Sequence, residues 1–444
     1  MSNQNLRVEY VTMESITPYT NNPRIHKNKQ IRQIVNSIKE FSFNNPILID
    51  EDNVIIAGHG RLLAAEHLNL LKVPVIRLTH LTEAEKKAYR LADNKLTENG
   101  EWDVDLLKLE LVEIEKLELD FSLDITGFDT ADIDLMLDNS LADKEIKIDE
   151  KANAVPFIPK NEVISETGWV WQLGKHRVIC GNAIEKESYT RLFADKKADM
   201  VFTDPPYNVP VHGHICGNGK VKHSEFKMAS GEMSPEEFQL FLSSNFILLK
   251  EFSKNGSLVF ICMDWRHIRE IINAETEVFE EFKNLCVWNK DNGGMGSLYR
   301  SKHELIFVFK NGRRPHKNNV ELGSHGRYRT NVWDYPGVNS FSGDKDKLKM
   351  HPTVKPVEMI RDAILDVTNR GNIVLDSFLG SGSTLIAAEQ ASRICYGIEL
   401  EPLYVDTTIR RWQELTGKSA VHVGTGKTYR ELLEIHLIEE NNEK

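Results

Sequence analysis

One short motif joins a carboxylate, two prolines and an aromatic ring, just after the apolar run at 200 to 202: Asp204, Pro205, Pro206 and Tyr207. Proline lacks a backbone N–H and holds φ near about −65°, so a strand ends here with unpaired carbonyl groups. Asp204 and the Pro205 carbonyl could accept hydrogen bonds from a planar amine while Tyr207 stacks on its ring. The alternative is a proline-stiffened turn that does no chemistry.

A second motif, LDSFLGSGST at 375 to 384, follows an apolar run and opens a helical pattern at 385 to 390. Gly380 and Gly382 allow a ligand to approach the backbone where helix N–H groups point outward. No GKS or GKT follows, so this is not a P-loop. A later apolar run ends at Glu399, where a carboxylate can accept from ribose hydroxyls. Beside the Asp204 motif, this turn predicts a nucleoside ligand.

Together the two motifs resemble the DNA amino-methyltransferases, which methylate N6 of adenine or N4 of cytosine with S-adenosylmethionine. The resemblance covers roughly residues 165 to 416. The catalytic motif comes first and the cofactor motif last, the order of the β group of that family. The resemblance implies that Asp204, Pro205, Pro206 and Tyr207 are catalytic and that they receive a flipped-out base.

The resemblance also implies a set of cofactor-binding residues. The segment HPTVKP at 351 to 356 stands where the β group lines the methionine end of the cofactor. Asn182 departs from the usual Asp of the family, although its amide oxygen could still accept from the cofactor adenine. The expected cofactor-binding residues are Asp376, Phe378, Gly380, Ser381, Gly382, Thr384, Glu399, Lys355, Pro356, Asn182 and Ala183.

Charge is distributed unevenly along this acidic chain, whose formal net charge is −11. Residues 81 to 150 hold 21 Asp or Glu against 8 Lys or Arg, whereas residues 285 to 350 hold 12 Lys or Arg against 6 Asp or Glu. A basic segment in an acidic chain favours contact with phosphate, although charge also fluctuates along any sequence. We assign target recognition to this segment. The expected DNA-binding residues are Arg300, Lys302, Arg313, Arg314, Arg327 and Arg329.

Near the N-terminus, Gly58, His59, Gly60 and Arg61 end an apolar run and open a helical pattern. Two glycines, a helix N-terminus and an arginine could cradle a phosphate, or could form an ordinary strand-to-helix turn. This part of the chain resembles the ParB-like domains, whose partition members bind nucleotide and DNA. Similar modules precede methyltransferases in phage and mobile-element proteins, so a nucleotide is a candidate partner here.

No metal is expected, although His212, His214, Cys216 and His223 lie close together after the Asp204 motif. Their spacings fit no familiar zinc pattern, and methyl transfer to an amine needs no metal. We interpret them as part of a glycine-rich loop that orders over the substrate. The five cysteines are scattered and odd in number, which favours reduced thiols.

These motifs require an α/β fold to position them. Alternating apolar runs and helical patterns predict a Rossmann-like S-adenosylmethionine-dependent methyltransferase sheet with helices on both faces and its ligand at the carboxyl ends of the strands. A small α/β ParB-like domain and an acidic helical connector precede it. The predicted domains are residues 1–100, the connector 101–160, the methyltransferase domain 161–430 with target recognition at about 285–350, and a tail at 431–444.

The leading hypothesis is a site-specific adenine-N6 DNA methyltransferase, because DPPY is more usual for adenine in this family. We expect such an enzyme in a restriction-modification system or in a phage. N4-cytosine methylation stays open, as does a ParB-like binding module on an inactive methyltransferase scaffold. No stretch approaches the roughly 18 uncharged apolar residues of a membrane helix, and no signal peptide is evident. We therefore expect a cytoplasmic enzyme with double-stranded DNA as partner and no membrane, and leave a homodimer open.

Overall fold

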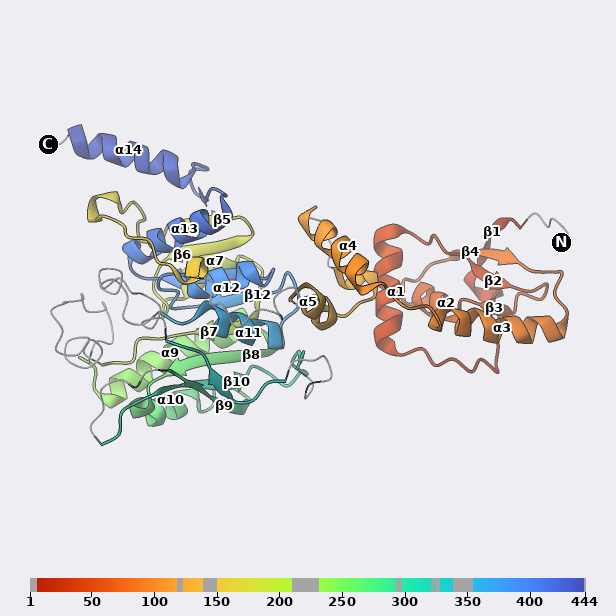
Figure 1. Ribbon diagram of the computed structural model, residues 1–444, viewed down its shortest axis with the longest axis horizontal. Helices are drawn as coiled ribbons and strands as arrows, with labels where there is room; N and C mark the ends of the chain where they lie inside the picture. Colours follow the sequence, from red (N-terminus) through yellow and green to blue (C-terminus); the bar gives the residue numbers. More distant parts are fainter. Residues whose placement is uncertain are drawn as a thin grey trace. The chain divides into compact units, whose positions relative to one another are not determined.

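The computed structural model describes residues 6–117, 123–138, 150–209, 231–291, 293, 298–320, 323, 328–337 and 354–442. The chain divides into two compact units, residues 1–143 and 144–444 (Figure 1). Helices of the segment expected to be an acidic connector fall in both units. Among the described residues, no helix is long and apolar enough to cross a membrane.

The first unit is built on a four-stranded sheet in the order β1-β4-β2-β3. Its strands are β1 (Val8–Thr12), β2 (Ile47–Ile49), β3 (Ile55–Ala57) and β4 (Lys72–Arg77). Its helices are α1 (Asn28–Phe41), α2 (His59–His67), α3 (Glu83–Glu98), α4 (Val104–Lys116) and α5 (Thr130–Asp138). Branched aliphatic residues suit the strands, and Ile47, Ile49 and Val75 are fully buried in the core.

The second unit contains a ten-stranded sheet in the order β11-β9-β10-β8-β7-β12-β13-β6-β5-β14. Its strands are β5 (Val170–Leu173), β6 (His176–Cys180), β7 (Ala198–Thr203), β8 (Ser253–Met263), β9 (Glu281–Asn289), β10 (His303–Lys310), β11 (Val332–Asp334), β12 (Ile373–Asp376), β13 (Ile394–Glu399) and β14 (Val421–His422). The five central strands β6, β13, β12, β7 and β8 run parallel to one another. Strand β10 runs antiparallel to β8 and β9.

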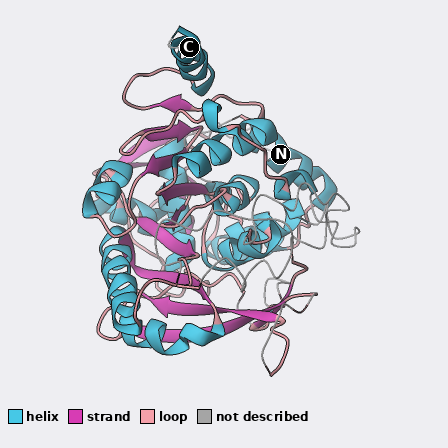
Figure 2. Ribbon diagram, turned by 90° about the vertical axis from the view of Figure 1, so that its left-hand side faces the viewer, coloured by secondary structure: helices cyan, strands magenta, loops and turns pink. Residues whose placement is uncertain are grey.

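Helices cover both faces of this sheet (Figure 2). The helices of this unit are α6 (Glu150–Asn153), α7 (Lys186–Phe193), α9 (Pro235–Phe252), α10 (Ile268–Glu275), α11 (Val357–Val367), α12 (Ser383–Gln390), α13 (Pro402–Thr416) and α14 (Tyr429–Asn442).

Side chains along β7 alternate between two cores, because successive strand residues point to opposite faces. Met200 and Phe202 pack with residues of α11, α12 and α13, whereas Val201 packs with residues of α7, α9 and α10. The predicted α/β sheet with helices on both faces is confirmed, as is the small α/β domain before it.

Candidate active site

The predicted motifs meet at the carboxyl ends of four neighbouring strands. Asp204 follows β7, Asp376 ends β12, Glu399 ends β13, and Asn182 lies two residues beyond the end of β6. The register pairs Val201 with Leu375, and Asp376 with Gly397, so the strand ends are level. Parallel pairing therefore brings together residues that lie far apart in the sequence, at the sheet edge where α/β proteins bind ligands.

Asp376 fixes the turn that follows β12. One carboxylate oxygen accepts from the Thr203 hydroxyl at 2.9 Å and from the Phe378 N–H at 3.0 Å, and the other accepts from the Thr384 hydroxyl at 2.6 Å. Burial raises the pKa of Asp376 to about 6. The side chain is 4% exposed. Asp376 thus holds β7, β12 and the start of α12 in one arrangement.

The glycine turn at 380 to 382 has the backbone freedom that the sequence predicts. Gly382 caps α12 at φ 86°, and a Cβ there would lie 2.7 Å from the Thr408 Cγ2. The Gly380 N–H donates to Glu399 Oε2 at 2.8 Å, and the Glu401 N–H donates to Glu399 Oε1 at 2.8 Å. Burial raises the pKa of Glu399 to about 7. Glu399 therefore binds the turn itself and still has acceptor capacity on each oxygen.

Asn182 and Ala183 form a tight turn after β6. The Asn182 amide oxygen accepts from the Ile184 N–H at 3.2 Å, and its amide nitrogen donates to Glu185 at 2.9 Å. The oxygen expected to contact the cofactor adenine is thus engaged within the turn. Ala183 is buried, and its carbonyl accepts from the Tyr189 hydroxyl at 2.8 Å.

Tyr207 turns back onto the carboxylate of the same motif. Its hydroxyl donates to Asp204 Oδ1 at 2.6 Å, and Lys355 Nζ donates to Asp204 Oδ2 at 2.6 Å. The Asp204 side chain is 23% exposed. Burial raises the pKa of Asp204, and the Lys355 charge and Tyr207 hydroxyl oppose that rise. Each oxygen of the predicted amine acceptor therefore already has one donor.

Glu304, at the start of β10, completes this cluster and was not predicted. Its carboxylate lies 3.0 Å from Lys355 Nζ and 3.3 Å from the Tyr207 hydroxyl, and it also binds Lys290. Burial opposes its charge, yet Lys355 and Lys290 hold the pKa of Glu304 at about 2. An acidic residue at the start of an apolar strand, inside a basic segment, was the available signal. Lys355, predicted to bind cofactor, places its ammonium on Asp204.

The structure divides the expected DNA-binding residues between the two edges of the sheet. Arg300 and Lys302 are exposed and precede β10, whose first residues lie at the same edge as Asp204. Arg313 and Arg314 are exposed beyond the other end of β10. A strand rises about 3.3 Å per residue, so this end lies roughly 25 Å away.

Arg329 is the least exposed of the expected DNA-binding residues that the structure describes. The guanidinium donates to Asp366 at 3.0 Å, Asp362 at 3.3 Å and the Tyr335 hydroxyl at 2.9 Å, and its side chain is 19% exposed. These contacts give it an intramolecular ion-pair role. Arg327 lies outside the described residues.

The loop that carries His212, His214, Cys216 and His223 also lies outside the described residues. Within the part of the chain that the structure describes, no group of His, Cys, Asp and Glu is arranged to hold a metal ion.

In the first unit, the arginine of the predicted phosphate cradle donates to backbone carbonyl groups of this chain. Gly58 caps α2 at φ 106°, and Arg61 donates to the Asn45 carbonyl at 2.9 Å and the Pro46 carbonyl at 2.5 Å. Burial lowers the pKa of His59 to about 4, so this imidazole is neutral near pH 7. Gly58, His59, Gly60 and Arg61 line a cavity of about 190 Å³.

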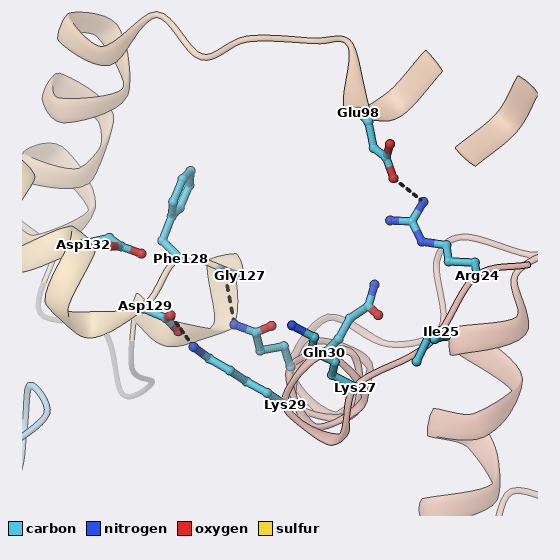
Figure 3. A pocket seen from close by; sticks show the side chains of 11 residues that line it. Arg24, Ile25, Lys27, Lys29, Gln30, Glu98, Gly127, Phe128, Asp129 and Asp132 are labelled. Carbon is cyan, nitrogen blue, oxygen red and sulfur yellow. Dashed lines mark hydrogen bonds and ion pairs between the residues drawn. The ribbon is translucent and has the colours of Figure 1, made fainter. Parts of the chain in front are cut away.

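A larger cavity of about 530 Å³ lies next to it, since Arg24 and Gln30 line both (Figure 3). Two ion pairs lie at this cavity: Lys29 binds Asp129, and Arg24 lies 3.5 Å from Glu98. The pairs tie α1 and the segment before it to α3 and to the start of α5.

Three family models match successive parts of the chain. The ParB N-terminal domain matches residues 1–95, and the ParB-methyltransferase HTH domain matches residues 105–167. A DNA methylase model for the N6/N4 type matches residues 198–410, which include the Asp204 motif, Glu304, Lys355 and the glycine turn.

Relatives match the two parts of the chain separately. The ParB-like nuclease domain-containing protein YnaK of Escherichia coli (strain K12) is 46% identical over 84 residues, 19% of this chain and 97% of YnaK. Type II methyltransferase M2.MboI of Moraxella bovis is 27% identical over 246 residues, 53% of this chain and 87% of that protein. DNA adenine methyltransferase YhdJ of Escherichia coli (strain K12) is 26% identical over 245 residues, 49% of this chain and 76% of YhdJ. The chain contains a DNA methylase domain of the N6/N4 type and carries a ParB-type domain ahead of it.

Proposed function

We propose that the protein transfers a methyl group from S-adenosylmethionine to the exocyclic N6 of adenine in double-stranded DNA. The observation that carries this proposal is the partly exposed Asp204 carboxylate, at a strand end beside a glycine turn and a buried acid. The name of the relative YhdJ and the more usual association of DPPY with adenine support the choice of base.

The residues at the glycine turn fit a nucleoside cofactor. Gly380 has φ 54°, and a Cβ built there would meet no atom within 4 Å, so the backbone is open to a ligand. The Glu399 carboxylate at the neighbouring strand end can accept from ribose hydroxyls. Bound here, S-adenosylmethionine would supply an electrophilic methyl group.

Asp204 would activate the target amine. An aromatic amine is a poor nucleophile because its lone pair is delocalised into the ring. If Asp204 and the Pro205 carbonyl accept its two hydrogens out of the ring plane, the lone pair localises and can attack the methyl group in line. The amine then loses a proton. Because a paired base is buried in the duplex, it must flip into the site, where Tyr207 is the proposed stacking partner.

The remaining assignments are finer proposals. Cofactor binding is assigned to the residues around the turn, and DNA binding foremost to Arg300 and Lys302 at the Asp204 edge. The cavity beside residues 58 to 61 supports a nucleotide partner at the first unit. A cytoplasmic location fits a DNA-modifying enzyme.

Product identification tests the function. Wild-type protein and Asp204→Ala are incubated with unmethylated plasmid DNA and S-adenosylmethionine, and the DNA is digested to nucleosides for mass spectrometry. We expect N6-methyladenine from the wild type and none from Asp204→Ala. The control is Asp195→Ala, because Asp195 is exposed at the opposite end of β7. N4-methylcytosine would overturn the choice of base, and cofactor binding without any methylated base would overturn the proposed reaction.

A further inference from the structure

Both donors that occupy Asp204 also lie within reach of a second carboxylate. Lys355 Nζ lies 2.6 Å from Asp204 and 3.0 Å from Glu304. The Tyr207 hydroxyl lies 2.6 Å from Asp204 and 3.3 Å from Glu304. Glu304 is thus an alternative acceptor for each hydrogen bond that Asp204 now receives.

Such an acceptor matters because the proposed reaction makes a competing demand on Asp204. The target amine must donate to an Asp204 oxygen that already accepts from Lys355 or Tyr207, so it shares the remaining acceptor capacity of a carboxylate whose charge the Lys355 ammonium already neutralises. Lys355 is 5% exposed, so its ammonium cannot turn to bulk water when the amine arrives. Leaving a buried charged donor without a partner is costly.

The strand pairing and Lys290 hold Glu304 where it can accept hydrogen bonds from Lys355 and Tyr207. It opens β10, pairs in register with Trp288 of β9, and binds Lys290 just beyond the end of β9. Its side chain is 17% exposed. Lys290 neutralises part of its charge and fixes it at the sheet edge, so that it faces Asp204 across the Lys355 ammonium.

We propose that Glu304 is a positioning residue that accepts the hydrogen bonds of Lys355 and Tyr207 when the target amine binds Asp204. This inference rests on the proposed function and names a residue beyond its two amine acceptors. Lys355 and Tyr207 then exchange one carboxylate acceptor for another within the same cluster. The Lys355 ammonium stays paired throughout.

Glu304→Gln removes the charge while keeping the shape. Lys355 would then stay on Asp204, and the amine would compete poorly for it. We expect kcat/KM for DNA to fall at least about tenfold, with affinity for S-adenosylmethionine within about twofold of wild type. Glu304→Asp keeps the charge and should recover part of the loss.

A double-variant cycle with Tyr207→Phe tests the shared donors. Tyr207→Phe keeps the ring and removes one of the two donors to Asp204. With fewer donors to displace, Glu304→Gln should cost less in the Tyr207→Phe background than in the wild type. Additive losses would contradict the proposal.

The acid limb of the pH profile gives a readout that a purely structural role would not move. The titratable groups around Asp204 are Tyr207 on its own segment, Cys262 of β8, Glu304 of β10, Lys355 before α11 and Asp376 of β12. The Glu304 charge raises the pKa of Asp204. Glu304→Gln should therefore lower the maximal rate while moving the acid limb of kcat/KM to lower pH.

The matched control is Glu281→Gln. Glu281 also pairs with lysines of β9 and β10, Lys283 at 3.0 Å and Lys310 at 3.6 Å, but at the opposite end of these strands. We expect it to match wild type within about twofold. The proposal is overturned if Glu304→Gln retains wild-type kcat/KM, or if it is slow without a shift of the acid limb. Failure of the wild type to methylate DNA would instead refute the proposed function.

Discussion

Two glycine turns in this chain share the same backbone geometry but contact different residues. Gly58 in the first unit and Gly382 in the second both follow a strand, adopt positive φ and cap a helix. After Gly58, Arg61 binds carbonyl groups of residues 45 and 46. Around Gly382, the turn binds Glu399 and adjoins Asp376 beside Asp204. The residues at the neighbouring strand ends therefore determine which ligand a glycine turn can bind. The sequence of the turn alone does not determine it.

Among changes to the two glycine turns, the largest effect is expected at Gly382. A Cβ there would lie 2.7 Å from Thr408 Cγ2 in a backbone conformation that favours glycine. Gly382→Ala should reduce methyl transfer at least about tenfold and destabilise the second unit by about 1–3 kcal/mol. Gly371→Ala is the control, because Gly371 has φ 74° and open space around it. Cofactor titration and chemical denaturation measure both effects, and equal losses in the two variants would contradict the account.

Acidity should affect the stability of the two units in opposite directions. Burial raises the pKa of Glu399 to about 7 and of Asp376 to about 6, so the second unit binds these protons more tightly when folded and loses stability as pH rises from about 5 to about 7. Burial lowers the pKa of His59 to about 4, so the first unit gains stability over that window.

Thermal unfolding followed separately for the two units at several pH values would measure these opposite pH dependences of stability. The lysine-paired Glu304 contributes little to the slope of the second unit, because its folded pKa of about 2 and its ordinary pKa of 4.5 both lie below the window. Glu399→Gln and His59→Asn should flatten the respective slopes. Parallel slopes in the two units would contradict the burial argument.

Arg61 should act as a structural link within the first unit. Arg61→Met removes its hydrogen bonds to Asn45 and Pro46 and should destabilise this unit by about 1–2 kcal/mol in urea. Arg77→Met provides a comparison, because Arg77 of β4 in the same unit also donates to backbone carbonyl groups, those of Asp50 and Glu51. Unchanged stability together with weaker nucleotide binding would show that Arg61 instead faces a ligand.

The smallest expected effect is a difference in KM for DNA between substitutions at the two edges of the methylase sheet. Lys302→Ala, at the Asp204 edge, should raise KM for DNA severalfold, and Arg313→Ala, beyond the far end of β10, should raise it less. Titration of DNA at two salt concentrations checks this, since a phosphate contact also reduces the salt dependence. A larger effect from Arg313 would place DNA at the opposite edge.

Local patterns predicted much of this molecule. The apolar run before Asp204 lies in β7, and the glycine turn opens α12, which contains the helical pattern at 385 to 390. Strand β1 was not predicted, because most of its residues are exposed and its sequence shows little alternation.

Pairwise contacts of the site were harder to predict. Glu304 reaches Asp204 only because β10 runs antiparallel to β8, which brings the start of β10 to the carboxyl edge. The same reversal carries Arg313 and Arg314 away from that edge. The contact of Lys355 with Asp204 joins residues 151 positions apart, and no spacing rule encodes it.

The most direct test is the methyl-transfer rate of Asp204→Asn under single-turnover conditions, with Asp195→Asn as control. Asparagine keeps the shape of the side chain but loses the charge and one acceptor oxygen. We predict a loss of at least about 100-fold with S-adenosylmethionine binding retained, because the carboxylate acts on the amine in the transition state. A rate within a few-fold of wild type would contradict the central role of Asp204.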